Sequence, residues 1–190
     1  MTSEEEFGTA IEATLARGHR VASGLGGDRR FPDGTLALQF PHFAPHFANR
    51  GVDLSGFYRG TLNLSISPWR YTVRSPKVTV RDLRWSSVSP PEDFSFFDCR
   101  LTVKKHRDRV EPQTVAGLIS YPHPETKPEH FQADDLLQVL APRIDGLAYR
   151  ARVELAVRDR QMNFAKLDRR RCATLTPTNR RAGGSNSRTL

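Results

Sequence analysis

Alternation of hydrophobic and polar residues along the chain predicts a protein built mainly of short β-strands. The clearest example is YRGTLNLSI, residues 58–66, in which Leu62, Leu64 and Ile66 alternate with small polar residues. This is the pattern of a strand with one buried face. Similar alternation predicts further strands in residues 68–85 and 149–159. Residues 19–31 are expected to form a strand that enters a Gly-rich turn, residues 99–112 a hairpin with a charged tip, and residues 114–122 an apolar strand. Gly and Pro residues separate the segments, as in a small closed β-barrel, with a β-sandwich as the alternative.

Two segments are predicted to form short helices. Residues 4–17 follow the S-x-x-E capping pattern of residues 3–6, which is typical of a helix start. Residues 133–142 end in a proline, which stops a helix. The Phe- and Pro-rich residues 35–54 show little periodicity, and we expect a long connection with room for one short helix.

The predicted elements divide the chain into an N-terminal helix (residues 1–18), a β-barrel domain (19–160) and a basic tail (161–190). The 190 residues carry a net charge of +8, and six of these positive charges come from arginines of residues 169–190, which contain no acid. A segment so poor in apolar side chains cannot bury enough surface to fold, so we expect it to be disordered and to bind polyanions weakly. The body of the chain is nearly balanced in charge, which disfavours a nucleic-acid-binding surface there.

Membrane insertion, secretion and disulfide formation are not expected from the sequence. No stretch approaches the roughly 18 apolar residues of a membrane helix, and the acidic N-terminus lacks the apolar segment of a secretory signal. Cys99 and Cys172 lie far apart and form no CxxC pair. The expected location is therefore the reducing cytoplasm.

A glycine-rich turn, SGLGGDRRF, spans residues 23–31. Gly24, Gly26 and Gly27 allow backbone N–H groups to approach an anion closely, and Arg29 and Arg30 add positive charge. The turn is therefore a candidate phosphate site, with an ordinary tight turn between strands as the alternative.

Thr61 and Asn63 share one face of the strand at residues 58–66 and offer two neutral oxygens to one ion. Mg²⁺ prefers hard oxygen ligands and can take its charge balance from substrate phosphates. The alternative is a structural hydrogen-bonding pair across two strands.

Acidic and histidine residues supply weaker candidates. Asp134 and Gln138 are four residues apart, hence on one face of the predicted helix, with Asp135 beside them. They could accept a proton or recognise ligand donors, although acids near a helix start are common. His42 and His46 are also four residues apart, but no carboxylate or thiol partner accompanies them.

Three motifs together resemble the archaeal CTP-dependent riboflavin kinase family. They are SGLGG at residues 23–27, GTLNL at residues 60–64 and QVLAP at residues 138–142, and the resemblance covers roughly residues 19–159. It implies a cradle-loop β-barrel that transfers a phosphoryl group from CTP to riboflavin, giving FMN and CDP, with Mg²⁺ as cofactor.

The resemblance also implies roles for individual residues. Thr61 and Asn63 would bind Mg²⁺, and Gln138 with either Thr126 or His130 would bind the flavin. The nucleotide would be bound by Gly24, Leu25, Gly26, Gly27, Asp28, Arg29 and Arg143. The catalytic base is not identified, and Asp134 and Asp135 are the candidates.

This chain departs from the family pattern at two of these positions: Asp28 replaces a glycine and Gln138 replaces a glutamate. Three alternatives to a riboflavin kinase-like enzyme therefore stay open. They are a barrel of the same family that binds a nucleotide or flavin without catalysis, an enzyme of the same fold acting on another hydroxylated substrate, and a basic nucleic-acid-binding module. The sequence does not indicate the oligomeric state.

Overall fold

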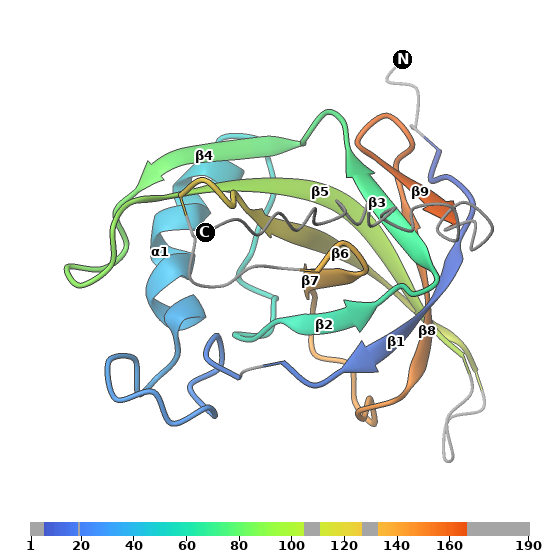
Figure 1. Cartoon of the computed structure of the whole chain (residues 1–190), viewed down its shortest axis with the longest axis horizontal. Helices are drawn as coiled ribbons and strands as arrows, with labels where there is room; N and C mark the ends of the chain where they lie inside the picture. The colour runs from blue at the N-terminus through green and yellow to red at the C-terminus, as the bar shows by residue number, and fades with distance from the viewer. Residues whose placement is uncertain (1–5, 19, 105–110, 127–132, 167–190) are drawn as a thin grey trace, which may run out of the picture.

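A computed structural model of the chain describes residues 6–18, 20–104, 111–126 and 133–166 (Figure 1). Within these residues the chain forms one α-helix, α1 (Thr35–Ala48). The strands are β1 (Ile11–Ala16), β2 (Leu62–Ser65), β3 (Trp69–Val73), β4 (Val78–Leu83), β5 (Glu92–Val103), β6 (Gln113–Pro122), β7 (Leu136–Leu140), β8 (Arg152–Val157) and β9 (Met162–Lys166).

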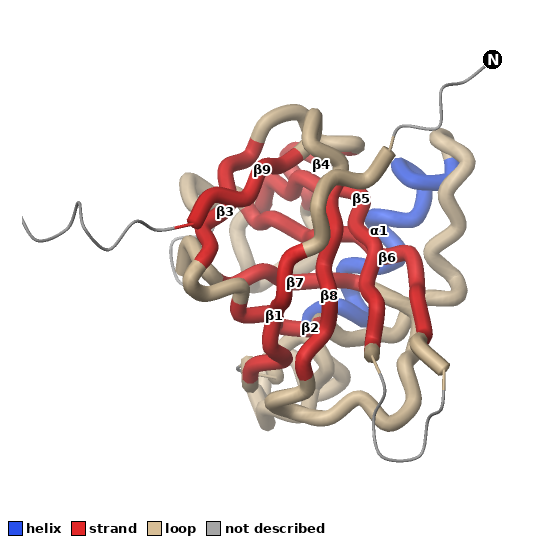
Figure 2. Tube along the Cα trace, turned by 90° about the vertical axis from the view of Figure 1, so that its right-hand side faces the viewer, coloured by secondary structure: helices blue, strands red, loops and turns tan. Residues whose placement is uncertain are grey.

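The strands close into an antiparallel barrel. β5, β6, β7, β2, β1 and β8 pair in that order, and β8 pairs back with β5 to complete a six-stranded ring (Figure 2). β4 pairs with the free side of β5, while β3 and β9 form a separate two-stranded sheet. The prediction of a mainly β protein with a small closed barrel is therefore confirmed.

Both predicted short helices are wrong, because each segment is a barrel strand. Within residues 4–17, the described part contains β1, which pairs with β2 on one side and β8 on the other. Within residues 133–142, β7 pairs with β2 and β6. Apolar residues spaced four apart fit both a helix and a strand. Pairing on both sides decides the outcome, since it satisfies the backbone N–H and C=O groups along both edges of each strand.

The Phe- and Pro-rich connection, in which at most one short helix was expected, contains the 14-residue helix α1. α1 buries Leu36, Gln39, Phe43 and Phe47, which recur at the spacing of one helix face. Phe43 packs edge-on against Phe94 and Phe96 of β5, with ring centroids 5.3 and 5.1 Å apart. The prolines at positions 41 and 45 are both exposed on the outer face. Aromatic burial thus outweighs the hydrogen bonds that the two prolines remove.

The barrel domain extends past residue 160. β9 lies within the segment assigned to the tail, pairs with β3 along its whole length and buries Met162 completely. The predicted disordered tail lies otherwise outside the described residues, as does the tip of the hairpin between β5 and β6. α1, the helix of the described residues, is too short to cross a membrane.

Two hydrophobic cores lie on opposite faces of the same strands. The inner core fills the barrel and includes Leu64, Leu137, Val139 and Leu155. The outer core lies between the barrel wall, β4 and α1, and it includes the rings of Phe43 and Phe96. Leu118 of β6 and Leu140 of β7 belong to this outer core, so alternate residues of β6 and β7 face α1 and not the barrel interior.

We expect barrel closure to depend on Leu155, which is fully buried on β8, the strand that pairs with both β1 and β5. Leu155→Ala should lower the free energy of unfolding by about 2–5 kcal/mol, because it removes buried methyl groups and leaves a cavity. Leu38→Ala, at a side chain that is 44% exposed on α1, is the matched control and should change it by about 0.5 kcal/mol or less. Equal effects of the two substitutions in urea denaturation would contradict the assignment.

Candidate functional site

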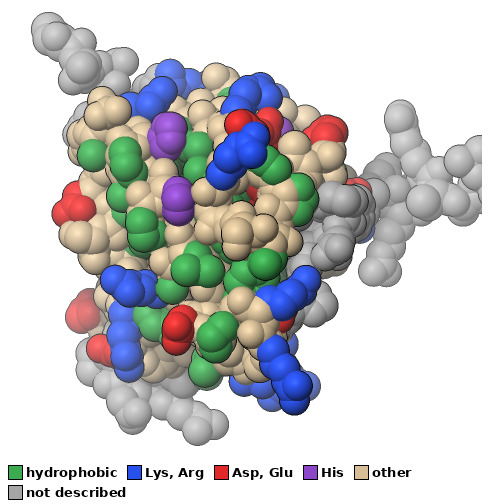
Figure 3. Space-filling view, turned by 90° about the vertical axis from the view of Figure 1, so that its left-hand side faces the viewer, with side chains coloured by type: hydrophobic (Ala, Val, Ile, Leu, Met, Phe, Trp, Pro, Cys, Tyr) green, Lys and Arg blue, Asp and Glu red, His purple; other side chains and the backbone are tan. Residues whose placement is uncertain are grey.

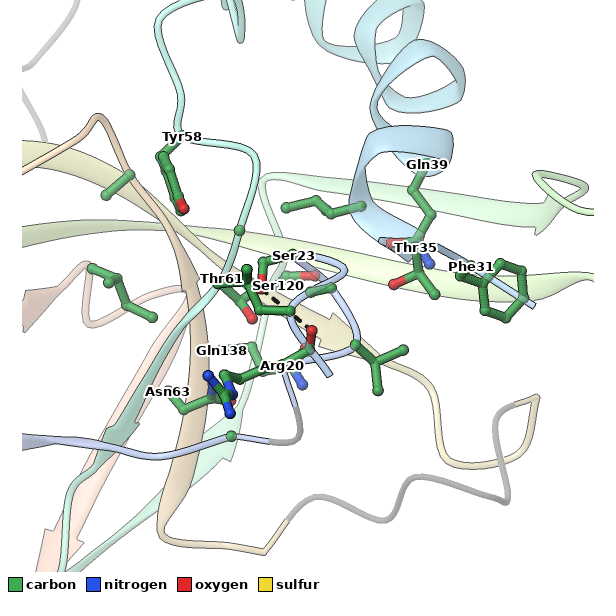
Figure 4. A pocket seen from close by; sticks show the side chains of 18 of the residues that line it. Arg20, Ser23, Phe31, Thr35, Gln39, Tyr58, Thr61, Asn63, Ser120 and Gln138 are labelled. Atoms are coloured by element: carbon green, nitrogen blue, oxygen red, sulfur yellow. Dashed lines mark hydrogen bonds between the residues drawn. The ribbon is translucent and has the colours of Figure 1, made fainter. Parts of the chain in front are cut away.

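A cavity of about 700 Å³ lies against the outer face of the barrel (Figure 4). Its walls come from β2, β6 and β7, from the loop at residues 20–34, from the start of α1 and from residues 141–149. This volume is within the usual range of small-molecule sites. Segments that are distant in sequence thus meet around one space.

A row of polar side chains crosses the barrel wall beneath this cavity. Asn63 of β2 is the register partner of Gln138 on β7, and Gln138 is the partner of Ser120 on β6. All three line the cavity. They share the outer face with Leu118 and Leu140, because alternate residues of each strand point to the same side. Asn63 therefore points away from the barrel interior, which the leucines of β2 occupy.

The side-chain amide of Asn63 lies close to the backbone of Gly18. A β-carbon at residue 18 would collide with the side-chain amide of Asn63. Gly18 follows β1, whose last residue, Ala16, is the register partner of Asn63. The absence of a side chain at Gly18 therefore allows the amide to lie between the two segments and to reach the cavity.

The glycine-rich turn is closed by its own backbone. The N–H groups of Gly24, Gly26 and Gly27 donate to the carbonyls of Val21, Arg20 and Gly24, at N···O distances of 3.2, 3.0 and 3.3 Å. Gly24 has a φ of +75° and lies so close to Gly34 that neither residue has room for a β-carbon. These glycine amides shape the loop, and the side of the loop that lines the cavity carries Leu25 and Asp28.

Asp28 and Arg30 form an ion pair at the edge of the cavity. Arg30 donates from Nη2 to Asp28 Oδ2 at 3.0 Å and from its backbone N–H to Oδ1 at 2.9 Å. The carboxylate that replaces a glycine of the family pattern is therefore matched by a neighbouring cation. This pairing reduces the repulsion that Asp28 would exert on a bound anion.

Arg20 brings a further cation into the cavity and was not predicted from the sequence. It has a positive φ of 57°, which is uncommon for a residue other than glycine. Its carbonyl accepts hydrogen bonds from Ser23 Oγ at 3.3 Å and from the backbone of Gly26. In Figure 4 its guanidinium group points toward the same part of the cavity as Asn63 and Gln138. We call this part, with Thr61, the polar end.

The opposite part of the cavity is aromatic, and we call it the ring end. Its walls include Phe31, Trp85 and Phe94, and the centroids of Phe31 and Trp85 are 5.3 Å apart. Two polar side chains are buried there, Gln39 and Glu92, each 5% exposed. Oε2 of Glu92 accepts a hydrogen bond from Trp85 Nε1 at 3.3 Å.

The structure brings together seven of the fourteen site residues that the sequence suggested. The residues that line the cavity are Leu25, Asp28 and Arg143, proposed for the nucleotide; Thr126 and Gln138, proposed for the flavin; and Thr61 and Asn63, proposed for the metal. The glycines at 24, 26 and 27 and the arginine at 29 belong to the loop but not to the lining. His130 lies outside the described residues.

The two candidate catalytic acids lie away from the cavity. Asp135 Oδ2 forms an ion pair with Arg70 Nη1 at 3.2 Å, and the carbonyl of Asp134 accepts a hydrogen bond from the backbone of Tyr71. Both partners belong to β3, and neither aspartate lines the cavity. The two aspartates lie just before β7, in a segment where a helix was expected. Their contacts connect this segment to the sheet of β3 and β9.

Several lining residues were not identified from the sequence. Ser120 is one small polar residue in an apolar strand, and Glu92 is one acid after a proline pair. Their importance comes from register and burial, which need the pairing of distant strands. The strand alternation around Ser120 was the signal that could have identified it, since it places the hydroxyl on the face opposite the barrel interior.

The donor set at the polar end suits Mg²⁺ only together with an anionic ligand. Thr61 and Asn63 supply hard but neutral oxygens. In the described part of the chain, no group of three or more His, Cys, Asp or Glu side chains is placed to hold a metal. The two residues therefore fit a Mg²⁺ ion that arrives with the phosphates of a nucleotide.

His42 and His46 lie one turn apart on α1, and both are exposed. Figure 3 shows the α1 face, where histidine and hydrophobic side chains gather. Both histidines are outside the cavity lining. The prolines between and beside them do not prevent the helix, contrary to expectation, but no third ligand joins the pair among the described residues.

Comparisons of the chain with protein families, with curated proteins and with solved structures found no match. A function is therefore inferred from the residues of the chain and their geometry.

The buried environment of Tyr71 predicts a loss of stability at alkaline pH. Burial, with smaller effects of Tyr121 and Asp134, raises the pKa of Tyr71 from 10.0 to about 12. The unfolded chain then loses the Tyr71 proton at lower pH than the folded protein does, so the free energy of unfolding should fall between about pH 10 and pH 12. Tyr71→Phe keeps the ring and removes the proton.

Denaturation curves at several pH values test this. The difference in unfolding free energy between the wild-type protein and the Tyr71→Phe variant should change from pH 9 to pH 12, with the wild type losing more. Parallel curves over this range would contradict the buried environment of Tyr71.

Proposed function

We propose that the protein is a riboflavin kinase-like phosphotransferase, which transfers a phosphoryl group from a nucleoside triphosphate, with CTP favoured, to riboflavin. One observation carries the proposal. Residues to which the family resemblance gives separate roles with a nucleotide, a flavin and a metal, such as Arg143, Thr126 and Asn63, line one cavity although they come from distant segments. Their meeting supports a single site for two substrates.

The polar end suits the chemistry of phosphoryl transfer, which needs positioning and charge neutralisation more than covalent catalysis. Arg20 offers positive charge to phosphates, as does Arg143, whose Nε donates to Asp145 Oδ1 at 3.0 Å. Asn63 and Gln138 are held in register by strand pairing. Mg²⁺, bound through Thr61 and Asn63, would neutralise charge on the phosphates. In the reaction the ribityl 5′-oxygen forms the new P–O bond and loses its proton, and the nucleoside diphosphate leaves.

A specific observation favours one alternative, a barrel that binds nucleotide or flavin without catalysis. The glycine amides that could cradle phosphates donate instead to carbonyls of the loop. Asp28 adds a carboxylate to the lining, although Arg30 pairs with it. In this alternative the same cavity binds the ligands, but no phosphoryl group is transferred.

Incubation of the protein with riboflavin, Mg²⁺ and each nucleoside triphosphate in turn distinguishes the two. Chromatography should detect FMN and the nucleoside diphosphate in equal amounts, with CTP as the best donor. Riboflavin binding without any FMN, for every donor, would leave the non-catalytic barrel as the function.

We expect Asn63→Ala to abolish most turnover while leaving the fold intact. Loss of a group that holds the metal should lower the rate of FMN formation by roughly 100-fold. Because the side chain lies outside both cores, the free energy of unfolding should change by about 0.5 kcal/mol or less.

Asn163→Ala is the matched control. Asn163 lies on β9, outside the cavity lining, and its substitution should leave FMN formation unchanged. If Asn63→Ala unfolds the protein, or leaves the Mg²⁺ dependence of turnover unaltered, Asn63 is a structural hydrogen-bonding residue and the metal assignment is wrong.

A further inference from the structure

α1 carries one polar residue, Gln39, in the row of side chains that it buries. That row consists of Leu36, Gln39, Phe43 and Phe47. Gln39 is 5% exposed, and Phe43, one helical turn further along, packs against rings of β5. Burial of a side-chain amide is costly unless hydrogen bonds compensate for it. The packing of α1 on the barrel would favour an apolar side chain here, so the amide needs another explanation.

The side-chain amide of Gln39 is directed into the ring end of the cavity (Figure 4). No hydrogen bond joins it to another side chain or to the backbone within the described residues. The walls around it include the rings of Phe31 and Trp85. A ligand can therefore hydrogen-bond to this amide without breaking a contact inside the protein, and the gain includes the cost of leaving the amide unpaired.

Ser120 of β6 is a second buried polar residue of the cavity lining. It is 6% exposed, and its hydroxyl likewise has no hydrogen-bond partner in the described part of the chain. Its register partners are Phe96 on β5 and Gln138 on β7. Ser120 therefore lies where the polar row ends and the packing of α1 on β5 begins. Two buried polar groups thus face the cavity from opposite walls, as in a site that orients its ligand.

A side-chain amide offers a donor and an acceptor side by side. Its best partner is a ligand edge on which an N–H group adjoins an acceptor atom. The aromatic walls favour a flat ring that carries such an edge. The rim agrees with this, because four of the large hydrophobic side chains that are exposed in the described residues line the cavity: Leu25, Tyr58, Val88 and Tyr149.

Both substrates of the proposed reaction have such an edge, on the pyrimidine part of riboflavin and on cytosine. The position of Thr126, a predicted flavin residue, favours riboflavin at the ring end. Its hydroxyl accepts a hydrogen bond from the backbone N–H of Asp93 at 2.9 Å, and the next residue of β5, Phe94, is a wall of the ring end. Arg20 contributes its charge at the polar end, where it suits the phosphates of the nucleotide.

We infer that Gln39 binds the imide edge of riboflavin. Its side-chain oxygen accepts a hydrogen bond from the N–H group at ring position N3, and its side-chain nitrogen donates to a carbonyl beside that position. This inference rests on the proposed function, because it takes riboflavin as the phosphoryl acceptor. Gln39 then determines acceptor specificity, since a flavin without the N3 hydrogen leaves the buried amide oxygen unpaired.

The test compares the affinities of riboflavin and 3-methylriboflavin, which lacks the imide N–H, by titration of flavin fluorescence. The wild-type protein should bind riboflavin about 10-fold more tightly, the factor that corresponds to one hydrogen bond. Gln39→Leu should reduce this preference to about twofold or less, mainly by weakening riboflavin binding. Gln113→Leu is the matched control, because Gln113 begins β6 outside the cavity lining, and it should keep the preference.

Urea denaturation of the ligand-free Gln39→Leu variant distinguishes a binding role from a structural one. The variant should unfold at the same urea concentration as the wild type or at a higher one, because it removes a buried unpaired amide from an apolar row. A clearly lower midpoint, or failure to fold, would show that the amide supports the fold and would contradict the inference.

The binding outcomes also decide the inference. A wild-type preference below about twofold overturns it, and this measurement needs no variant. An unchanged preference in the Gln39→Leu variant overturns it as well, since the added methyl group would then only collide with the site. Weaker binding of CDP with Mg²⁺, but not of riboflavin, by this variant would assign the ring end to the nucleotide and overturn it too.

Chromatography of the same samples with CTP and Mg²⁺ separates this inference from the proposed function. FMN formation without the preference contradicts only the role of Gln39. A Gln39-dependent preference without FMN contradicts only the kinase activity. Absence of riboflavin binding by the wild-type protein contradicts both.

Discussion

The antiparallel pairing of β2 with β7 is the constraint on which the candidate site depends. Its register sets Asn63 beside Gln138, and the next pairing sets Gln138 beside Ser120. Because strand residues alternate between faces, Leu64 of β2 with Leu137 and Val139 of β7 fill the barrel, and Asn63 and Gln138 must face outward. A slip of one residue would exchange these faces and place the amides in the barrel core, where they would lack partners.

The outward polar row becomes a site only because a second core covers that face of the barrel. α1 packs its phenylalanines on the outer face of β5. The loop at residues 20–34, which leads into the helix (Figure 1), lines the same cavity as the row. The space left between them is polar at one end and aromatic at the other. This division suits one ligand with phosphates and another with a flat ring. It arises because rings of the outer core, such as Phe31 and Trp85, line one end of the cavity and the polar row lines the other.

The sequence alone could predict the closed barrel and several of its strands, because inward leucines and valines alternate clearly in residues 62–65, 114–122 and 152–157. It could not identify β1 and β7, because the spacing of their apolar residues fits both a helix and a strand until the neighbouring strands are known. The full length of α1 was not predicted, because Pro41 and Pro45 oppose helix formation locally, whereas aromatic packing against β5 supplies the compensating energy. Site residues within motifs, such as Asn63, were found. Glu92 was not, since its burial depends on tertiary structure.

The central claim is that one cavity outside the barrel binds both substrates, and NMR titration tests it most directly. Amide and side-chain N–H resonances would be followed while CDP with Mg²⁺, and then riboflavin, are added to the isotope-labelled protein. Shifts should concentrate at Asn63, Gln138 and Ser120 for the first ligand and at Trp85 and Glu92 for the second. Shifts confined to residues outside the cavity lining, or no shifts with either ligand, would contradict the account.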